Sequence, residues 1–140
     1  MDIEIPKIGL TFSRLLMPQI KDTQAFLKKL KDEHIEYRKI TVDTDSLKST
    51  QQDFDLDKVR LMMYDTNKKP IIISNDDYIL DGHHRWLSDH NSKRKTDAIR
   101  VDLPILELMR FAKLDEKAPI LECVKNVSKL AVASNNYKYK

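Results

Sequence analysis

The sequence predicts an α+β domain, with a small mixed sheet flanked by helices. Short runs that are β-branched or alternate between apolar and polar residues indicate strands near residues 35–42, 71–73, 78–80 and 98–103. Longer runs with apolar residues at helical spacing lie between and after them. No repeat, low-complexity tract or long linker interrupts the chain, so we expect one domain over residues 1–140.

The first two helices are expected to flank the strand at residues 35–42. Asp22 or Thr23 is typical of a helix N-cap and predicts a helix to about His34. A second helix is expected to start within Leu47–Asp53 and to run to about Tyr64. In that start, Ser49 with Gln52 or Thr50 with Asp53 could form a capping box.

The two ends of the chain complete the expected fold. Residues 1–20 are apolar in places but show no clear period, and we interpret them as an ordered arm. The fold prediction includes an N-terminal helical arm and a C-terminal helix. Helical spacing predicts helices over 104–112 and 119–133, and the second could cover the sheet or form a homodimer. Residues 134–140 are expected to be frayed.

Composition describes an ordinary globular protein. Charged residues make up 34% and hydrophobic residues 41% of the 140 residues, which is enough for a core. The single cysteine, Cys123, points to a reducing compartment. The sequence contains no run of about 18 apolar residues, so no membrane span is predicted. The N-terminus lacks the order of a basic region and then an apolar region that marks a signal peptide. We therefore expect a cytoplasmic protein, whose net charge of +3 permits contact with DNA.

The most informative stretch is Lys69–Trp86. A buried strand, Ile71–Ile73, is followed by a polar turn, and Tyr78–Leu80 reads as a second short strand. Gly82 then precedes a helix predicted over His83–His90. The free backbone N–H groups of a helix start lie at the positive end of the helix dipole, which favours phosphate or carboxylate. The sequence thus predicts an anion site at this loop.

The loop also carries side chains that could do chemistry. Arg85 offers a planar fork of donors to phosphate oxygens, and Gly82 lets a ligand approach the backbone. His83 and His84 are each candidates for a general acid or base, with at most one expected to face the ligand. Asp81 could bind Mg²⁺ or Mn²⁺, orient a histidine, or cap the following helix.

The strand, the turn and the run D-G-H-H-R-W at Asp81–Trp86 resemble the ParB/sulfiredoxin-like superfamily, over about Ile40 to Phe111. Its members bind nucleotide phosphates with this loop and the following helix. They include partition proteins, free-amino-acid kinases, sulfiredoxins and ParB-like nucleases. The resemblance implies this superfamily's fold and a nucleotide such as ATP or ADP, with Mg²⁺ or Mn²⁺ brought in with it. It also implies that Thr50, Gln51 and Lys58 could reach the ligand.

Two departures narrow the choice within that superfamily. Sulfiredoxins carry a reactive cysteine where this chain has His83, so reduction of a sulfinic acid through that position is not expected. Partition proteins have an Arg-rich loop followed by a long helical DNA-reading region, for which 140 residues leave no room.

Three functions remain open. The first is a ParB-like nuclease or nucleotide hydrolase that acts on phosphodiester or phosphoanhydride bonds, which the basic, compact chain slightly favours. The second is a small-molecule kinase of the free-amino-acid type. It needs an acid to activate the acceptor hydroxyl, for which Glu33, Glu36 and Asp53 are candidates. The third is a non-catalytic nucleotide- or DNA-binding module.

Overall fold

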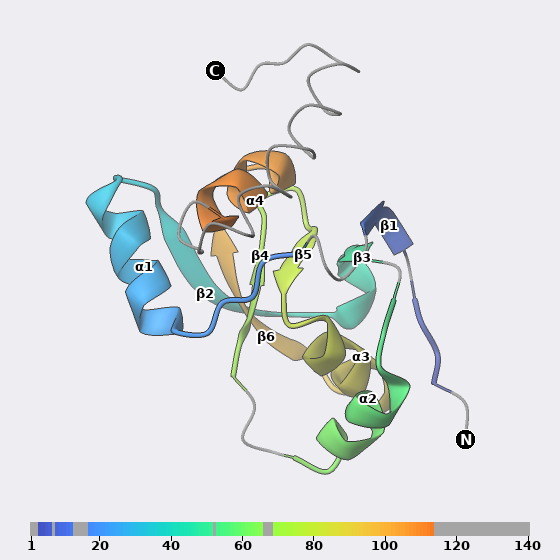
Figure 1. Ribbon diagram of the computed structural model, residues 1–140. Helices are drawn as coiled ribbons and strands as arrows, with labels where there is room; N and C mark the ends of the chain where they lie inside the picture. The colour runs from blue at the N-terminus through green and yellow to red at the C-terminus, as the bar shows by residue number, and fades with distance from the viewer. Residues whose placement is uncertain (1–2, 7, 13–16, 52, 66–68, 114–140) are drawn as a thin grey trace.

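The computed structural model describes residues 3–6, 8–12, 17–51, 53–65 and 69–113 (Figure 1). Within these residues, four α-helices accompany a four-stranded mixed sheet and a separate two-stranded sheet. The predicted α+β class and its mixed sheet are therefore confirmed.

The larger sheet has the strand order β2-β6-β4-β5. Its strands are β2 (Tyr37–Val42), β6 (Thr96–Val101), β4 (Ile71–Ile73) and β5 (Ile79–Asp81). β6 pairs antiparallel with β2 and parallel with β4, while β4 and β5 form an antiparallel pair. The parallel pair requires a crossover between β4 and β6, and the chain makes it through β5 and a helix.

Helices lie on both faces of this sheet (Figure 1). α1 (Thr23–Asp32) and α4 (Ile105–Lys113) cover one face, while α3 (His83–Asn91) covers the other and α2 (Leu56–Met62) packs against α3. Because side chains alternate along a strand, the sheet supplies both cores. The α1 side receives Ile72, Leu80, Ile99 and Val101, and the α3 side receives Ile71, Ile73, Ile79 and Ala98.

Two aromatic rings pack against each other on the α1 side of the sheet. The ring of Phe26 on α1 meets the ring of Phe111 on α4 edge to face, with centroids 5.8 Å apart. α1 is amphipathic, and its buried residues are Phe26, Leu27 and Leu30. Its predicted start is confirmed, since the side chain of Asp22 accepts a hydrogen bond from the backbone N–H of Ala25.

The segment Leu47–Asp53 does not start a helix, so that prediction is wrong. Its centre, Ser49–Gln51, is strand β3, which pairs in parallel with β1 (Ile8–Phe12). The N-terminal arm was also expected to be helical, but Ile8–Phe12 within it form strand β1, so that prediction is wrong over these residues. Pairing with a distant segment outweighs the local capping pattern here, because β3 is buried and the Thr50 hydroxyl donates to the backbone oxygen of Ile79 at 2.7 Å.

α2 begins later than predicted, at Leu56. Its N-cap is Asp55, whose carboxylate accepts a hydrogen bond from the backbone N–H of Lys58 at 3.2 Å. Neither expected capping box forms this helix start: the Thr50 hydroxyl is committed to β5, and Gln52 lies outside the described residues.

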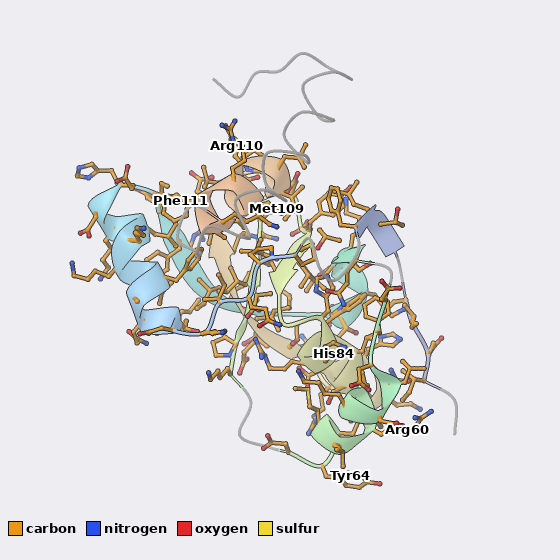
Figure 2. All side chains as sticks on the ribbon, in the orientation of Figure 1. Arg60, Tyr64, His84, Met109, Arg110 and Phe111 are labelled. Atoms are coloured by element: carbon orange, nitrogen blue, oxygen red, sulfur yellow. The ribbon has the colours of Figure 1, made fainter. Side chains whose placement is uncertain are left out.

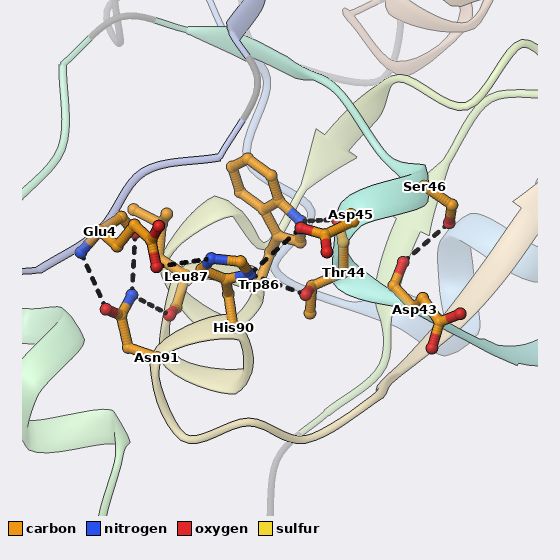
Figure 3. A network of polar contacts seen from close by, with 9 residues as sticks. All are labelled: Glu4, Asp43, Thr44, Asp45, Ser46, Trp86, Leu87, His90 and Asn91. Carbon is orange, nitrogen blue, oxygen red and sulfur yellow. Dashed lines mark hydrogen bonds and ion pairs between the residues drawn. The ribbon is translucent and has the colours of Figure 1, made fainter.

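The first described residues are fastened to the end of α3 (Figure 3). The backbone N–H of Glu4 donates to the side-chain oxygen of Asn91 at 2.8 Å, and the Asn91 amide donates to the backbone oxygens of Glu4 and Leu87. The Glu4 carboxylate lies 3.4 Å from Nε2 of His90, whose Nδ1 is 2.9 Å from the Thr44 hydroxyl. The N-terminal segment thus depends on one turn of α3.

Some predictions concern residues that the structure does not describe. The helix over 119–133, the end at 134–140, the homodimer through that helix and Cys123 all lie outside the described residues. Within the described part of the chain, no helix is both long enough and apolar enough to cross a membrane.

We expect Asn91→Ala to release the N-terminal segment, because this one side chain makes two hydrogen bonds to the backbone of Glu4. The predicted cost is about 1 kcal/mol in the free energy of unfolding, together with faster hydrogen exchange at the Glu4 amide. Asn75→Ala is a matched control, since Asn75 bonds Asp102 elsewhere on the surface. Unchanged exchange at Glu4 would contradict this role for Asn91.

Candidate functional site

The candidate site is built around a left-handed turn between β5 and α3. Gly82 is the N-cap of α3, with φ = 103°, and no side chain caps this helix end. A Cβ at this position would lie 2.5 Å from Cγ2 of Ile71 and 2.8 Å from Nη2 of Arg85. Glycine suits both the conformation and the limited space at this position. Asp81 does not cap the helix, which removes one of its three expected roles.

A cavity of about 230 Å³ lies at this N-terminus of α3. Its wall combines the loop with the segment before α1, with α2, with β3 and with Lys69, two residues before β4. Four of its lining residues are basic: Lys21, Lys58, Lys69 and Arg85. Among the described residues, the one carboxylate that lines it is that of Asp81. The arrangement gives the cavity an excess of positive charge at the positive end of a helix.

Seven of the eight residues expected at the site line this cavity: Gln51, Lys58, Asp81, Gly82, His83, His84 and Arg85. The eighth, Thr50, does not line the cavity, but its backbone N–H donates a hydrogen bond to the lining residue His83. Lys21 and Lys69 also line the cavity, although sequence reasoning did not select them. The sequence offered one signal for Lys69, which stands just before the buried strand that pairs with the loop strand.

Asp81 and Arg85 form an ion pair on the cavity wall. Nη2 of Arg85 is 3.2 Å from Oδ2 of Asp81 and donates a second hydrogen bond to the backbone oxygen of Pro70. The two side chains are only 19% and 18% exposed. Burial raises the pKa of Asp81, although Arg85 and a hydrogen bond from the backbone of Ile20 act in the opposite direction. Asp81 therefore holds Arg85 in place and ties the segment before α1 to the loop.

His83 is buried beneath the cavity, with only 4% of its surface exposed. Its Nε2 accepts a hydrogen bond from the backbone N–H of Thr50 at 3.1 Å, so this nitrogen carries no proton. Burial, with a smaller contribution from His84, lowers the pKa of His83 to about 3. A group with this pKa is neutral at pH 7, which argues against His83 as a general acid or base there.

His84 accepts a similar backbone hydrogen bond, from the start of α2. Its Nε2 accepts from the backbone N–H of Asp55, the N-cap of α2, at 2.9 Å. The ring of Phe54 meets it edge to face, with centroids 6.3 Å apart. Figure 2 places His84 on α3, on the side of α2. The two histidines thus hold the chain between β3 and α2 against α3.

The structure also bears on the expected metal ion and on the candidate kinase acids. Within the described part of the chain, no three His, Cys, Asp or Glu side chains are grouped so that they could hold a metal ion. The carboxylate of Asp81 already accepts from Arg85 and Ile20, so it is poorly suited to hold Mg²⁺ unaided. Binding of Mg²⁺ or Mn²⁺ mainly through the phosphates of a bound nucleotide stays a prediction. None of the three candidate kinase acids, Glu33, Glu36 and Asp53, lines the cavity.

Comparison with known proteins adds no family to this description. No protein-family model matches the chain, and no curated protein is significantly similar to it.

We expect Gly82→Ala to destabilise the protein by roughly 2–4 kcal/mol, because alanine meets both an unfavourable φ and a contact with Ile71. Urea denaturation would measure the loss. Gly82→Asn separates the two causes, since asparagine tolerates a positive φ but still carries a Cβ. An unfolding midpoint that is unchanged in Gly82→Ala would contradict the close packing of this turn.

The neutral His83 predicts a loss of stability in acid. Its pKa lies near 3 in the folded protein against 6.5 in the unfolded chain, so between these values the unfolded chain binds a proton that the folded one does not. The free energy of unfolding should fall as the pH falls, by at most about 1.4 kcal/mol per pH unit from this group.

His83→Gln tests this, because its amide oxygen can accept the Thr50 hydrogen bond without titrating. Urea denaturation from about pH 6.5 down to about pH 4 should give a shallower pH dependence in the variant than in the wild type. Equal slopes would show that His83 is not the group responsible.

Proposed function

We propose that this chain is a nucleotide-binding domain of the ParB/sulfiredoxin-like type, with the phosphate groups held at the Asp81–Arg85 loop. The observation that carries the proposal is the charge of the cavity: four cationic side chains surround the uncapped start of α3, against one carboxylate. An oxyanion gains from both the backbone N–H groups and the cations. Arg85 is one of these cations, and its planar guanidinium suits phosphate oxygens.

The size of the cavity supports phosphate groups rather than a whole nucleotide. Sites for drug-sized ligands usually measure about 300–1,000 Å³, whereas this cavity measures about 230 Å³. A di- or triphosphate chain is compatible with that volume, and a sugar and base would extend beyond it. The cations converge from four segments, which suits a ligand with several negative oxygens.

The surroundings of the loop support the ParB/sulfiredoxin-like assignment. The resemblance implied that a segment before the loop would lie against it and supply ligand contacts. Gln51 on β3 and Lys58 on α2 do line the cavity beside the loop.

The geometry favours binding over catalysis by the two histidines. Nε2 of each accepts a backbone N–H, from Thr50 in one case and Asp55 in the other. A general base needs a free lone pair within reach of the proton it removes. Cleavage of a phosphodiester or phosphoanhydride bond, and phosphotransfer to a small molecule, therefore remain proposals that need a further group or a bound ion. A module that binds nucleotide without turnover requires nothing more than the described cavity.

Calorimetric titration with ATP and ADP, each with and without Mg²⁺, tests the proposal. We expect binding that weakens as salt rises, and a loss of at least about tenfold in affinity in both Arg85→Ala and Lys58→Ala. Arg60→Ala is the matched control for Lys58→Ala, because Arg60 lies on the same helix, pairs with Asp57 and does not line the cavity (Figure 2).

Affinity that is unchanged in both cavity variants, or no binding at millimolar nucleotide, would overturn the proposal. The titrated samples should also be assayed for released phosphate and, with supercoiled plasmid, for nicking. Turnover that is lost in Arg85→Ala would identify the domain as a hydrolase or nuclease.

A further inference from the structure

A second and larger cavity, of about 530 Å³, adjoins the phosphate cavity. The two share three lining residues, Lys21, Thr23 and Lys69. The remaining wall of the second cavity comes from the first turns of α1, from Lys39 on β2, and from the sheet. Two cavities with a common boundary can hold two parts of one ligand.

The lining of the second cavity differs in chemistry from that of the first. Leu27, Pro70 and Ile99 give it an apolar wall from α1, from the residue before β4 and from β6. The first cavity has a mostly polar and cationic lining at the loop. The change from cationic to apolar occurs at the boundary formed by Lys21 and Lys69.

We propose that the second cavity takes the nucleoside of a nucleoside di- or triphosphate whose phosphates occupy the first. This inference rests on the proposed function and extends it to the rest of the ligand. A flat, weakly polar base packs well against the apolar wall, and the volume falls within the usual range for a drug-sized ligand. Lys21 and Lys69 then lie beside the phosphate nearest the sugar.

Polar groups at the second cavity suit a sugar and a base edge. Gln24 and Lys39 supply an amide and an ammonium group, and both residues are exposed at its rim. Asp22 is the one carboxylate that lines it among the described residues, and its Oδ1 accepts from the Ala25 N–H at 3.0 Å. Its second oxygen is suited to accept a hydrogen bond from a ribose hydroxyl. These contacts distinguish a nucleotide from inorganic polyphosphate.

The experiment compares nucleoside diphosphates (ADP, GDP, CDP and UDP) with inorganic pyrophosphate by calorimetric titration. The wild type should bind at least one of the four more tightly than pyrophosphate. Gln24→Trp fills the second cavity from α1, so it should weaken that binding by at least about tenfold and leave pyrophosphate binding unchanged. Ala25→Trp puts the same ring at an exposed neighbouring position that lines neither cavity, and it should bind like the wild type.

Lys39→Trp fills the cavity from the opposite wall and should act like Gln24→Trp, so the test does not depend on the folding of one variant. Diphosphate affinities that match the wild type in both filled variants would overturn the inference. Pyrophosphate that binds the wild type as tightly as every diphosphate would also overturn it, while leaving the phosphate site intact. A wild type that binds none of the five compounds would refute the proposed function itself.

Discussion

The contact between Gly82 and Ile71 is the constraint on which the site depends. The chain leaves β5 and enters α3 in one left-handed residue, and the side chain of fully buried Ile71 occupies the space where a Cβ would be. Trp86, itself fully buried, anchors the next turn of the helix. The start of α3 is therefore fixed against the sheet, and no side chain caps its backbone donors. Arg85 then lies one turn from Asp81, and the two pair on the cavity wall.

The run D-G-H-H-R combines structural support with the proposed phosphate site in five consecutive residues. The two histidines accept backbone N–H groups from Thr50 and Asp55, which fixes both ends of the connection between β3 and α2. That connection is what brings Lys58 to the cavity. A neutral imidazole suits His83, because a buried cation there, close to Arg85, would add repulsion to the cost of desolvation.

The sequence was informative where structure is set locally and misleading where distant segments decide it. The N-cap at Asp22 and the strand, glycine and helix of the loop follow from neighbouring residues. Ser49–Gln51 carried a local helix-start pattern, yet it forms a strand because Ile8–Phe12 lies beside it. Lys21 reaches the site only because the segment before α1 crosses to the loop and bonds Asp81, a long-range contact with no local signature.

The distribution of charge, rather than its total, supports the proposal of a small phosphate ligand. The net charge is only +3, and exposed ion pairs such as Lys28–Asp32 and Arg60–Asp57 neutralise cations over the helices at little gain in stability. At the cavity, four basic residues and one carboxylate among the described residues line a volume of only about 230 Å³, so the excess of basic residues is concentrated there. A duplex requires cations spread along a face to meet successive phosphates, whereas converging cations suit one compact polyanion. Concentration of charge in a cavity therefore favours a nucleotide over DNA as the ligand of this site.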